Sequence, residues 1–394
     1  MSLFRRREAT ITGPDGDIPS RPARKPGHVH VTNDSAMRHS AVWACLRLRA
    51  DMVSTMPVDV YRRVQGVQVE VPKPPVLVNP GGERVDMPEW LYSSQVDLDR
   101  AGNVFGVITD RTGVVGPDGR GLPGRIELVS LADVVVRAKG SQITEIRIGG
   151  EVYKGDRLAD IWHEKQFTLA GLPLGLSPVA YGAGAIEESL SAQQFALDWF
   201  GGSAIPAGEL KNVEKVVPPK ESAAIKERFR ATVSAGDVFV HGKDWEYKPI
   251  QAVAAQTAFI ESRQFGLTDI SRYFGCPADL IDAAVATGSI TYGTITQRNL
   301  QFLIMNLDPP VTRRETALGK LTPRPRYVKL NRGKLLAMDP ETRSRTIKTR
   351  LDSRVLTPTE ARALDDLPPL TDADLAEFDR VYGVPRTQPT EAKA

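Results

Sequence analysis

Apolar residues recur at intervals of three and four in several segments, which predicts amphipathic helices. One such helix is expected from about Ser35 to Pro57, since proline cannot continue a helix. Its apolar face holds Val42, Cys45, Leu46, Ala50, Val53 and Met56. Another is expected from Ser177, which suits the N-cap, to the glycine pair that ends at Gly202.

The stretch 256–307 has the pattern of two helices that flank a charge-poor loop. The first helix, 256–275, ends at a glycine and carries Phe259, Arg263, Leu267, Ile270 and Phe274 on one face. The loop, 278–293, has only two charged residues, Asp279 and Asp282, and its small residues predict mobility. The second helix is expected from about Thr294 to the Asp308-Pro309-Pro310 step.

Alternating and short apolar runs predict a set of strands in the first half of the chain. A Pro-rich linker is expected at 72–80, and a short helix that Asp86 caps and Pro88 opens follows it. Residues 111–124 carry five glycines and are expected to form a long turn. The expected strands are 58–64, 103–111, 126–131, 134–137, 143–148, 151–153 and 161–163. This pattern predicts an antiparallel α+β domain.

The second half is expected to contain a small α/β unit and a helical C-terminal part. The unit would consist of a strand at 207–210, a helix at 219–233, and a hairpin of strands 237–241 and 245–250. A strand at 326–330, a basic helix at 340–355 and a last helix after Thr357-Pro358 would follow the second long helix.

The two ends of the chain lack periodicity. Residues 1–34 are rich in Pro, Gly and Arg, and residues 385–394 are polar, so both are expected to be disordered. No apolar stretch suits a signal peptide or a membrane span. The two cysteines, Cys45 and Cys276, have no partner spacing, which indicates a reduced, intracellular product.

Composition and charge are those of a globular protein, with one local imbalance. The 394 residues allow two or three domains, and 41% hydrophobic residues suffice for a core. Residues 311–350 hold twelve Lys or Arg against three acids, whereas residues 351–394 hold five against nine. A nucleic-acid contact, a solvated face and an oppositely charged neighbouring subunit all remain open explanations.

The sequence contains no complete catalytic, cofactor-binding or metal-binding motif. No phosphate-binding loop is present, and Glu187 occupies the third glycine position of a partial dinucleotide fingerprint. Five scattered histidines and adjacent acid pairs do not converge on a site. The tryptophans are expected in the core or at subunit contacts: Trp43, Trp90, Trp162, Trp199 and Trp245.

Four segments, in this order along the chain, carry a family resemblance. They read AVWACLRLRADMVSTMPVDVYRR, GLSPVAYGAGAIEESLSAQQFALDWFGGSAIPAGEL, ESRQFGLTDISRYFGCPADLI and LTPTEARALDDLPPL. Together they resemble the portal proteins of long-tailed bacteriophages, over roughly residues 38–378. The glycine-rich 115–124 turn and the basic 313–350 region depart from that pattern.

The resemblance implies a twelve-subunit ring at one capsid vertex, with an axial channel for double-stranded DNA. Its parts follow along the chain as a wing (35–176), a stem helix (177–203), a clip (204–252), a second stem helix (253–275), a tunnel loop (276–293), a long wing helix with a strand (294–331) and a helical crown (332–384). The arm and tail, 1–34 and 385–394, lie outside this scheme.

The resemblance also assigns roles to individual residues. The DNA-facing tunnel loop would include Asp279, Asp282, Thr287, Gly288, Ser289 and Tyr292; the clip contact to the packaging motor or adaptor would include Lys226, Arg230, Lys243 and Trp245; the stem would include Glu187, Glu188, Glu261 and Arg263. A loop that has two aspartates and no lysine would repel duplex DNA slightly rather than bind it. Asp279 and Asp282 are therefore expected near the channel lumen.

The implied partners are other copies of the chain, the passing duplex, the terminase large subunit, the major capsid protein with its scaffold, and the head-tail adaptor. No membrane, cofactor or enzymatic activity is expected, and assembly would occur in the host cytoplasm before incorporation into the virion. Two alternatives remain: another head-tail connector ring component, and a DNA-acting nuclease.

Overall fold

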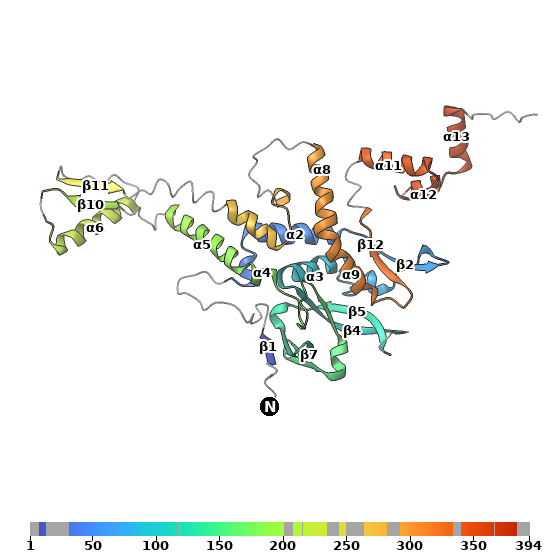
Figure 1. The fold of residues 1–394 in the computed structure, drawn as a ribbon, viewed down its shortest axis with the longest axis horizontal. Helices are drawn as coiled ribbons and strands as arrows, with labels where there is room; N and C mark the ends of the chain where they lie inside the picture. The colour runs from blue at the N-terminus through green and yellow to red at the C-terminus, as the bar shows by residue number, and fades with distance from the viewer. Residues whose placement is uncertain are drawn as a thin grey trace, which may run out of the picture. The chain divides into compact units, whose positions relative to one another are not determined.

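The computed structural model describes residues 8–12, 31–116, 119–200, 208–214, 216–234, 244–249, 264–281, 292–333, 340–365 and 367–383. Its chain divides into two compact units, Met1–Asn331 and Arg332–Ala394, whose elements are labelled in Figure 1. The expected crown begins at the same residue as the second unit. No helix among the described residues has both the length and the apolar character needed to cross a bilayer.

Three helices with clear end signals form the centre of the first unit. They are α1 (Asn33–Ala36), α2 (Ser40–Ser54) and α3 (Met87–Ala101). The Asp86 carboxylate accepts a hydrogen bond from the Glu89 backbone N–H at 2.9 Å, which confirms the predicted cap. All six residues of the predicted face between Val42 and Met56 are buried, but the helix is broken before His39, the N-cap of α2.

Three antiparallel sheets surround these helices, as an α+β fold class requires. The first sheet has the order β12-β2-β3, with β12 (Tyr327–Leu330), β2 (Val58–Val64) and β3 (Val67–Glu70). The second has the order β5-β4-β9, with β5 (Gly121–Leu128), β4 (Asn103–Val115) and β9 (Ile161–Lys165). The third has the order β1-β6-β7-β8, with β1 (Glu8–Thr12), β6 (Val134–Lys139), β7 (Gln142–Ile148) and β8 (Glu151–Lys154).

The predicted long turn at 111–124 is wrong. Strands β4 and β5 continue through most of it as a hairpin, with register shifts between Ile108 and Val115. A Cβ atom on Gly121 would lie 2.2 Å from the Thr112 carbonyl oxygen, so this glycine allows the two backbones to approach closely. The glycines thus mark a bulged hairpin, which sequence alone does not distinguish from an open turn.

Two other segments are more ordered than the sequence predicts. Residues 8–12, inside the expected disordered arm, form β1 and pair with β6 from Glu8↔Lys139 to Thr12↔Val135. The expected 72–80 linker contains the 3-10 helix η1 (Pro75–Leu77), whose Val76 and Leu77 are buried. Two further 3-10 helices, η2 (Leu131–Asp133) and η3 (Gly155–Asp160), connect strands. Within the 1–34 arm, the structure also describes residues 31–34, and Val31 among them is buried.

The long helix after residue 291 does not end at the Asp308-Pro309-Pro310 step. Helix α8 (Tyr292–Gln301) passes into a π-helical stretch, η5 (Phe302–Leu307), and continues as α9 (Asp308–Gly319). Both prolines occupy the first turn of α9, where a missing N–H costs little because the π stretch has already changed the hydrogen-bond register. The helix breaker therefore marks a change of helix type rather than an end.

The expected stem contains α4 (Pro178–Tyr181), α5 (Ala183–Phe200) and a helix at 264–273. The Ser177 hydroxyl accepts a hydrogen bond from the Ala180 N–H at 3.1 Å, as predicted for the N-cap. Val179 and Ile186 are buried, whereas Leu197 near the far end is 61% exposed.

The expected clip contains α6 (Pro219–Ser234) and a two-stranded sheet of β10 (Gly208–Asn212) and β11 (Trp245–Pro249). β11 pairs with β10, from Gly208↔Pro249 to Asn212↔Trp245. The predicted strand at 237–241 lies outside the described residues.

The second unit is helical, with α11 (Pro340–Asp352), α12 (Pro358–Ala363) and α13 (Asp372–Tyr382). Thr357 and Glu360 form a capping box at the start of α12, the expected last helix. A further helix, α13, was not predicted. Its start is also a capping box, made by Thr371 and Asp374.

Candidate functional site

The structure describes residues on both sides of the expected tunnel loop, and both sides pack against the same apolar cluster. The helix 264–273 closes at Gly275, whose φ of +62° suits glycine, and Cys276 donates its N–H to the Ser271 carbonyl at 3.0 Å. A 3-10 helix, η4 (Ala278–Ile281), follows. The predicted 278–293 loop is therefore wrong at its start, because residues 278–281 form a 3-10 helix that packs against the core.

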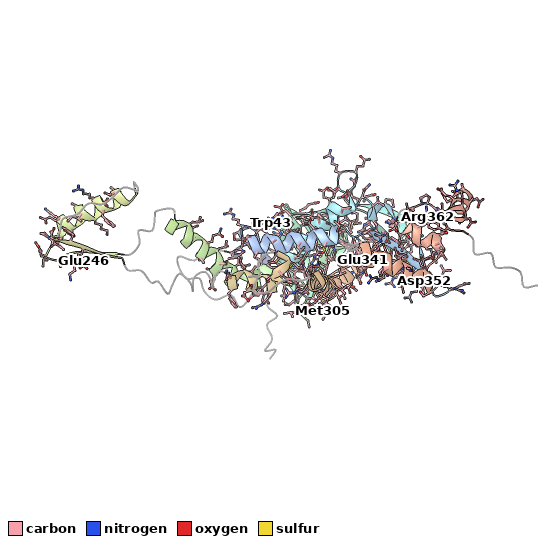
Figure 2. The ribbon with its side chains drawn as sticks, turned by 90° about the horizontal axis from the view of Figure 1, so that it is seen from above. Trp43, Glu246, Met305, Glu341, Asp352 and Arg362 are labelled. Atoms are coloured by element: carbon pink, nitrogen blue, oxygen red, sulfur yellow. The ribbon has the colours of Figure 1, made fainter. Side chains whose placement is uncertain are left out.

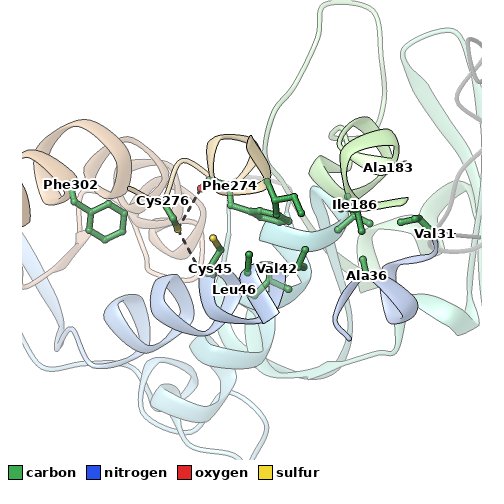
Figure 3. Close-up of a cluster of buried hydrophobic side chains, with 13 residues drawn as sticks. Val31, Ala36, Val42, Cys45, Leu46, Ala183, Ile186, Phe274, Cys276 and Phe302 are labelled. Atoms are coloured by element: carbon green, nitrogen blue, oxygen red, sulfur yellow. Dashed lines mark hydrogen bonds between the residues drawn. The ribbon is translucent and has the colours of Figure 1, made fainter. Parts of the chain in front are cut away.

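One apolar cluster holds these attachments together (Figure 3). Side chains from α2, α5, the helix 264–273 and the π stretch converge there, and Leu280 and Ile281 of η4 pack against it. Its buried members are Val31, Ala36, Ala41, Val42, Cys45, Leu46, Val179, Ala183, Ile186, Ile270, Phe274, Cys276 and Phe302. The residues before 282 and after 291 thus belong to one core, which fixes the positions at which the intervening segment leaves and returns.

An ion pair joins the two sides of that segment on the surface. The Asp279 carboxylate on η4 lies 2.8 Å from the Arg298 guanidinium on α8, and the two side chains are 18% and 53% exposed. Arg298 was not among the predicted site residues, because no local pattern relates it to an aspartate 19 positions earlier. The charge of Asp279 is therefore balanced within the chain.

A buried ion pair joins α2 to α3. Arg49 on α2 donates to both carboxylate oxygens of Asp99 on α3, at 3.0 and 3.1 Å, and Gln95 donates to Asp99 at 2.9 Å. Burial opposes the charged form of Arg49, but the Asp99 carboxylate outweighs it and the pKa of Arg49 is raised. Arg49 also donates to the carbonyl of Asn306 in the π stretch, at 3.5 Å.

A second buried arginine, on α9, contacts side chains of α3 and β9. Arg314 is fully buried and donates to Ser94 Oγ at 2.7 Å and to Gln95 Oε1 at 3.2 Å. Its Nε lies 3.4 Å from Glu164 of β9, and its guanidinium carbon lies 5.7 Å from the centre of the Trp90 ring. Burial raises the pKa of Glu164, while Arg314 and then Lys320 oppose that rise. Neither buried network was predicted, since its partners are far apart in sequence.

Two kinds of reactive group can be compared with the described residues, a metal site and an activated thiol. Among them, no group of three or more His, Cys, Asp or Glu side chains could hold a metal ion. Cys45 and Cys276 are buried free thiols, and the pKa of Cys45 is raised by its hydrogen bond with Cys276 and by burial. A buried thiol with a raised pKa is a poor nucleophile.

The structure places the remaining predicted residues as follows. Tyr292 begins α8, and Glu187 and Glu188 lie on α5, half-buried and exposed respectively. Lys226 is exposed on α6, Arg230 lies on the same helix, and Trp245 begins β11 and is half-buried. The others lie outside the described residues: Asp282, Thr287, Gly288, Ser289, Lys243, Glu261 and Arg263. Of the predicted tunnel-loop residues, Asp279 thus has a described ion pair, and its partner is Arg298 in the last turn of α8.

The tryptophans divide between core and surface. Trp90 and Trp162 are buried, with ring centres 6.5 Å apart, as predicted. Trp43 on α2 is 47% exposed and Met305 in the π stretch is 68% exposed; both are labelled in Figure 2. Exposed large apolar side chains of this kind are typical of contacts between subunits.

Comparison with known proteins decides the family. The family model described as phage portal protein matches residues 40–366. The chain belongs to the phage portal protein family. The match runs from α2 to just past the end of α12. It covers most of the expected wing, the expected stem and clip, and the first half of the second unit.

Individual relatives agree with this membership. The probable portal protein of Streptomyces phage phiC31 is 28% identical over 363 residues, covering 87% of this chain and 77% of that protein. The portal protein of Enterobacteria phage HK97 is 24% identical over 366 residues, covering 89% of this chain and 84% of that protein. A chain in the neck of a native gene transfer agent particle, solved with C12 symmetry, shares the fold with a TM-score of 0.56, 19% identity, and coverage of 89% of this chain and 96% of that one.

Proposed function

We propose that twelve copies of the chain form the portal ring at one capsid vertex, through which double-stranded DNA enters during packaging and leaves during ejection. The family match over residues 40–366 carries this proposal. The C12 symmetry of the gene transfer agent neck supports the number twelve. The ring would assemble in the host cytoplasm and remain in the virion.

The parts of the chain then have mechanical roles. The two stem helices line the path, and residues 276–293 form the tunnel loop beside the duplex, with η4 near its start and the first residues of α8 at its end. The clip, 204–252, docks the terminase large subunit during packaging and the head-tail adaptor afterwards. The wing faces the capsid protein and scaffold. No bond is made or broken in this mechanism.

Electron microscopy of the purified full-length chain tests the ring. We expect closed rings with an axial channel, with twelve-fold class averages predominating. A chain that remains monomeric, both alone and when co-expressed with its capsid protein and scaffold, would contradict the proposal. Rings with metal-dependent nuclease activity would instead favour the enzymatic alternative.

The acidic residues of the tunnel loop provide a second test. Replacing Asp279 and Asp282 by Lys places two added cations per subunit beside the channel. Because each phosphate contact releases counterions, we expect the variant rings to bind linear duplex DNA in 50 mM salt and to lose that binding by about 200 mM. Gel-shift titrations against salt measure this effect.

The matched control for this charge reversal is Asp156→Lys, at a fully exposed position of η3. We expect the control rings to behave like the unchanged protein. Equal DNA binding by both variants would show that the channel position of Asp279 and Asp282 is incorrect.

A further inference from the structure

Helix α13 is a short helix whose apolar side chains remain exposed in its own unit. It has 11 residues, and none of them is buried. Leu375 and Phe378 are each 47% exposed, and Val381 and Tyr382 are 60% and 78% exposed. A helix of this length is only marginally stable in water by itself, even with a capping box, so its apolar side requires a partner.

The same unit exposes a second and different apolar strip. Val355, which follows α11, is 68% exposed, and Leu364 and Leu367, which follow α12, are 47% and 48% exposed. We call these three residues the α11–α12 strip. Charged side chains of residues 340–363 flank these three residues in the sequence, and subunit interfaces combine apolar and charged residues in this way.

The charges around the two surfaces are opposite. Helix α13 holds four acids and one arginine, whereas residues 340–363 hold six Lys or Arg and three acids. Several of the basic side chains are exposed, among them Lys348, Arg350 and Arg354. The negative α13 thus has a partner of opposite charge on the same chain, and its negative charge disfavours contact with DNA phosphates.

Two unlike complementary surfaces on one subunit are the requirement for a head-to-tail contact, and such contacts form a ring when the rotation between neighbouring subunits closes. We propose that α13 of each copy docks on the α11–α12 strip of the next copy, so that a continuous belt forms around the crown. This proposal rests on the ring described above. It assigns the acidic and basic halves of the C-terminal sequence to the two sides of one interface (Figure 2, where Asp352 and Arg362 mark the basic half).

Cysteine cross-linking in assembled full-length rings tests the contact. The double variant Phe378→Cys/Leu364→Cys, oxidised mildly and run on a non-reducing gel, is expected to give a ladder of covalently linked subunits. Phe378→Cys alone gives no ladder, and neither does Phe378→Cys/Val64→Cys, in which the second position is 39% exposed in the wing. A cross-linked species that stays monomeric would overturn the proposal, because α13 would then dock within its own subunit.

Charge reversal gives an independent readout. Adding Glu377→Lys and Asp379→Lys to the cross-linking pair is expected to lower the ladder yield at least about tenfold, and further adding Arg350→Glu and Arg354→Glu is expected to restore it. Electron microscopy of the same samples separates the two proposals. Rings without a ladder overturn the crown contact alone, whereas absence of rings in the unchanged protein contradicts the portal function itself.

Discussion

Replacement of Arg314 by Met is expected to lower the free energy of unfolding by about 3–5 kcal/mol at pH 7, because Glu164 would lose its buried counter-charge. The guanidinium now lies 3.4 Å from the Glu164 carboxylate and donates to Ser94 and Gln95. Glu164 Oε2 has no hydrogen-bond partner among the described residues, and without Arg314 only the weaker influence of Lys320 would oppose the cost of burying the charge. Urea denaturation followed by tryptophan fluorescence measures the loss.

The pH dependence of this loss identifies its cause. Burial already raises the pKa of Glu164, and removal of Arg314 raises it further. A carboxyl whose folded pKa exceeds its unfolded pKa destabilises the protein at higher pH, so the defect should shrink as the pH falls from 7 toward 5.

The adjacent exposed Arg313 provides the matched control, and Arg313→Met should change stability by less than about 0.5 kcal/mol. The double variant Arg314→Met/Glu164→Gln should recover most of the stability, since it removes the unpaired charge. A defect that is constant with pH and is not relieved in the double variant would show that packing, and not charge, explains the role of Arg314.

Replacement of Gly102 by Ala is expected to cost about 2–6 kcal/mol, since backbone strain and overpacking each contribute roughly 1–3 kcal/mol. Gly102 caps α3 with a φ of +70°, and a Cβ atom there would lie 2.0 Å from the Leu176 carbonyl oxygen. The clash involves backbone, which has little freedom to move because the Gly102 carbonyl accepts from the Gln166 N–H at 2.8 Å. Thermal unfolding of the purified chain measures the effect.

Two other glycines separate the sources of that cost. Gly140 has a φ of +63° with open space around it, so Gly140→Ala isolates the backbone strain. Gly113 has open space and no positive φ, so Gly113→Ala should be nearly neutral. If Gly102→Ala were no worse than Gly140→Ala, the close approach to Leu176 would contribute nothing to stability.

The elements that the sequence predicts correctly have local signals at their ends. Helix α3 begins at the predicted Asp86 cap, and β2 has the predicted bounds 58–64, because capping, proline and alternation are local signals. The 111–124 hairpin and the continuation of the long helix through residue 308 were missed, since both depend on contacts made elsewhere in the fold. Helix α13 was missed although local signals for it are present, since a capping box begins it and Leu375, Phe378 and Tyr382 recur at intervals of three and four.

The candidate site was predictable only in part. Family resemblance located the segment between the stem and the long helix, but neither resemblance nor periodicity related Asp279 to Arg298. The Arg49–Asp99 and Arg314–Glu164 pairs join residues 50 and 150 positions apart, and no period in a sequence encodes such a pairing. Long-range electrostatics therefore had to come from the structure.

The shared core beneath the two loop anchors has an evolutionary consequence. Ile281 on one side and Phe302 on the other pack in the same apolar cluster. The two ends of the span between them therefore have fixed positions. Each doubling of such a span costs only about 0.6 kcal/mol in closure entropy. The length and sequence of this span can therefore change at little thermodynamic cost, while the core that fixes its two ends stays unchanged.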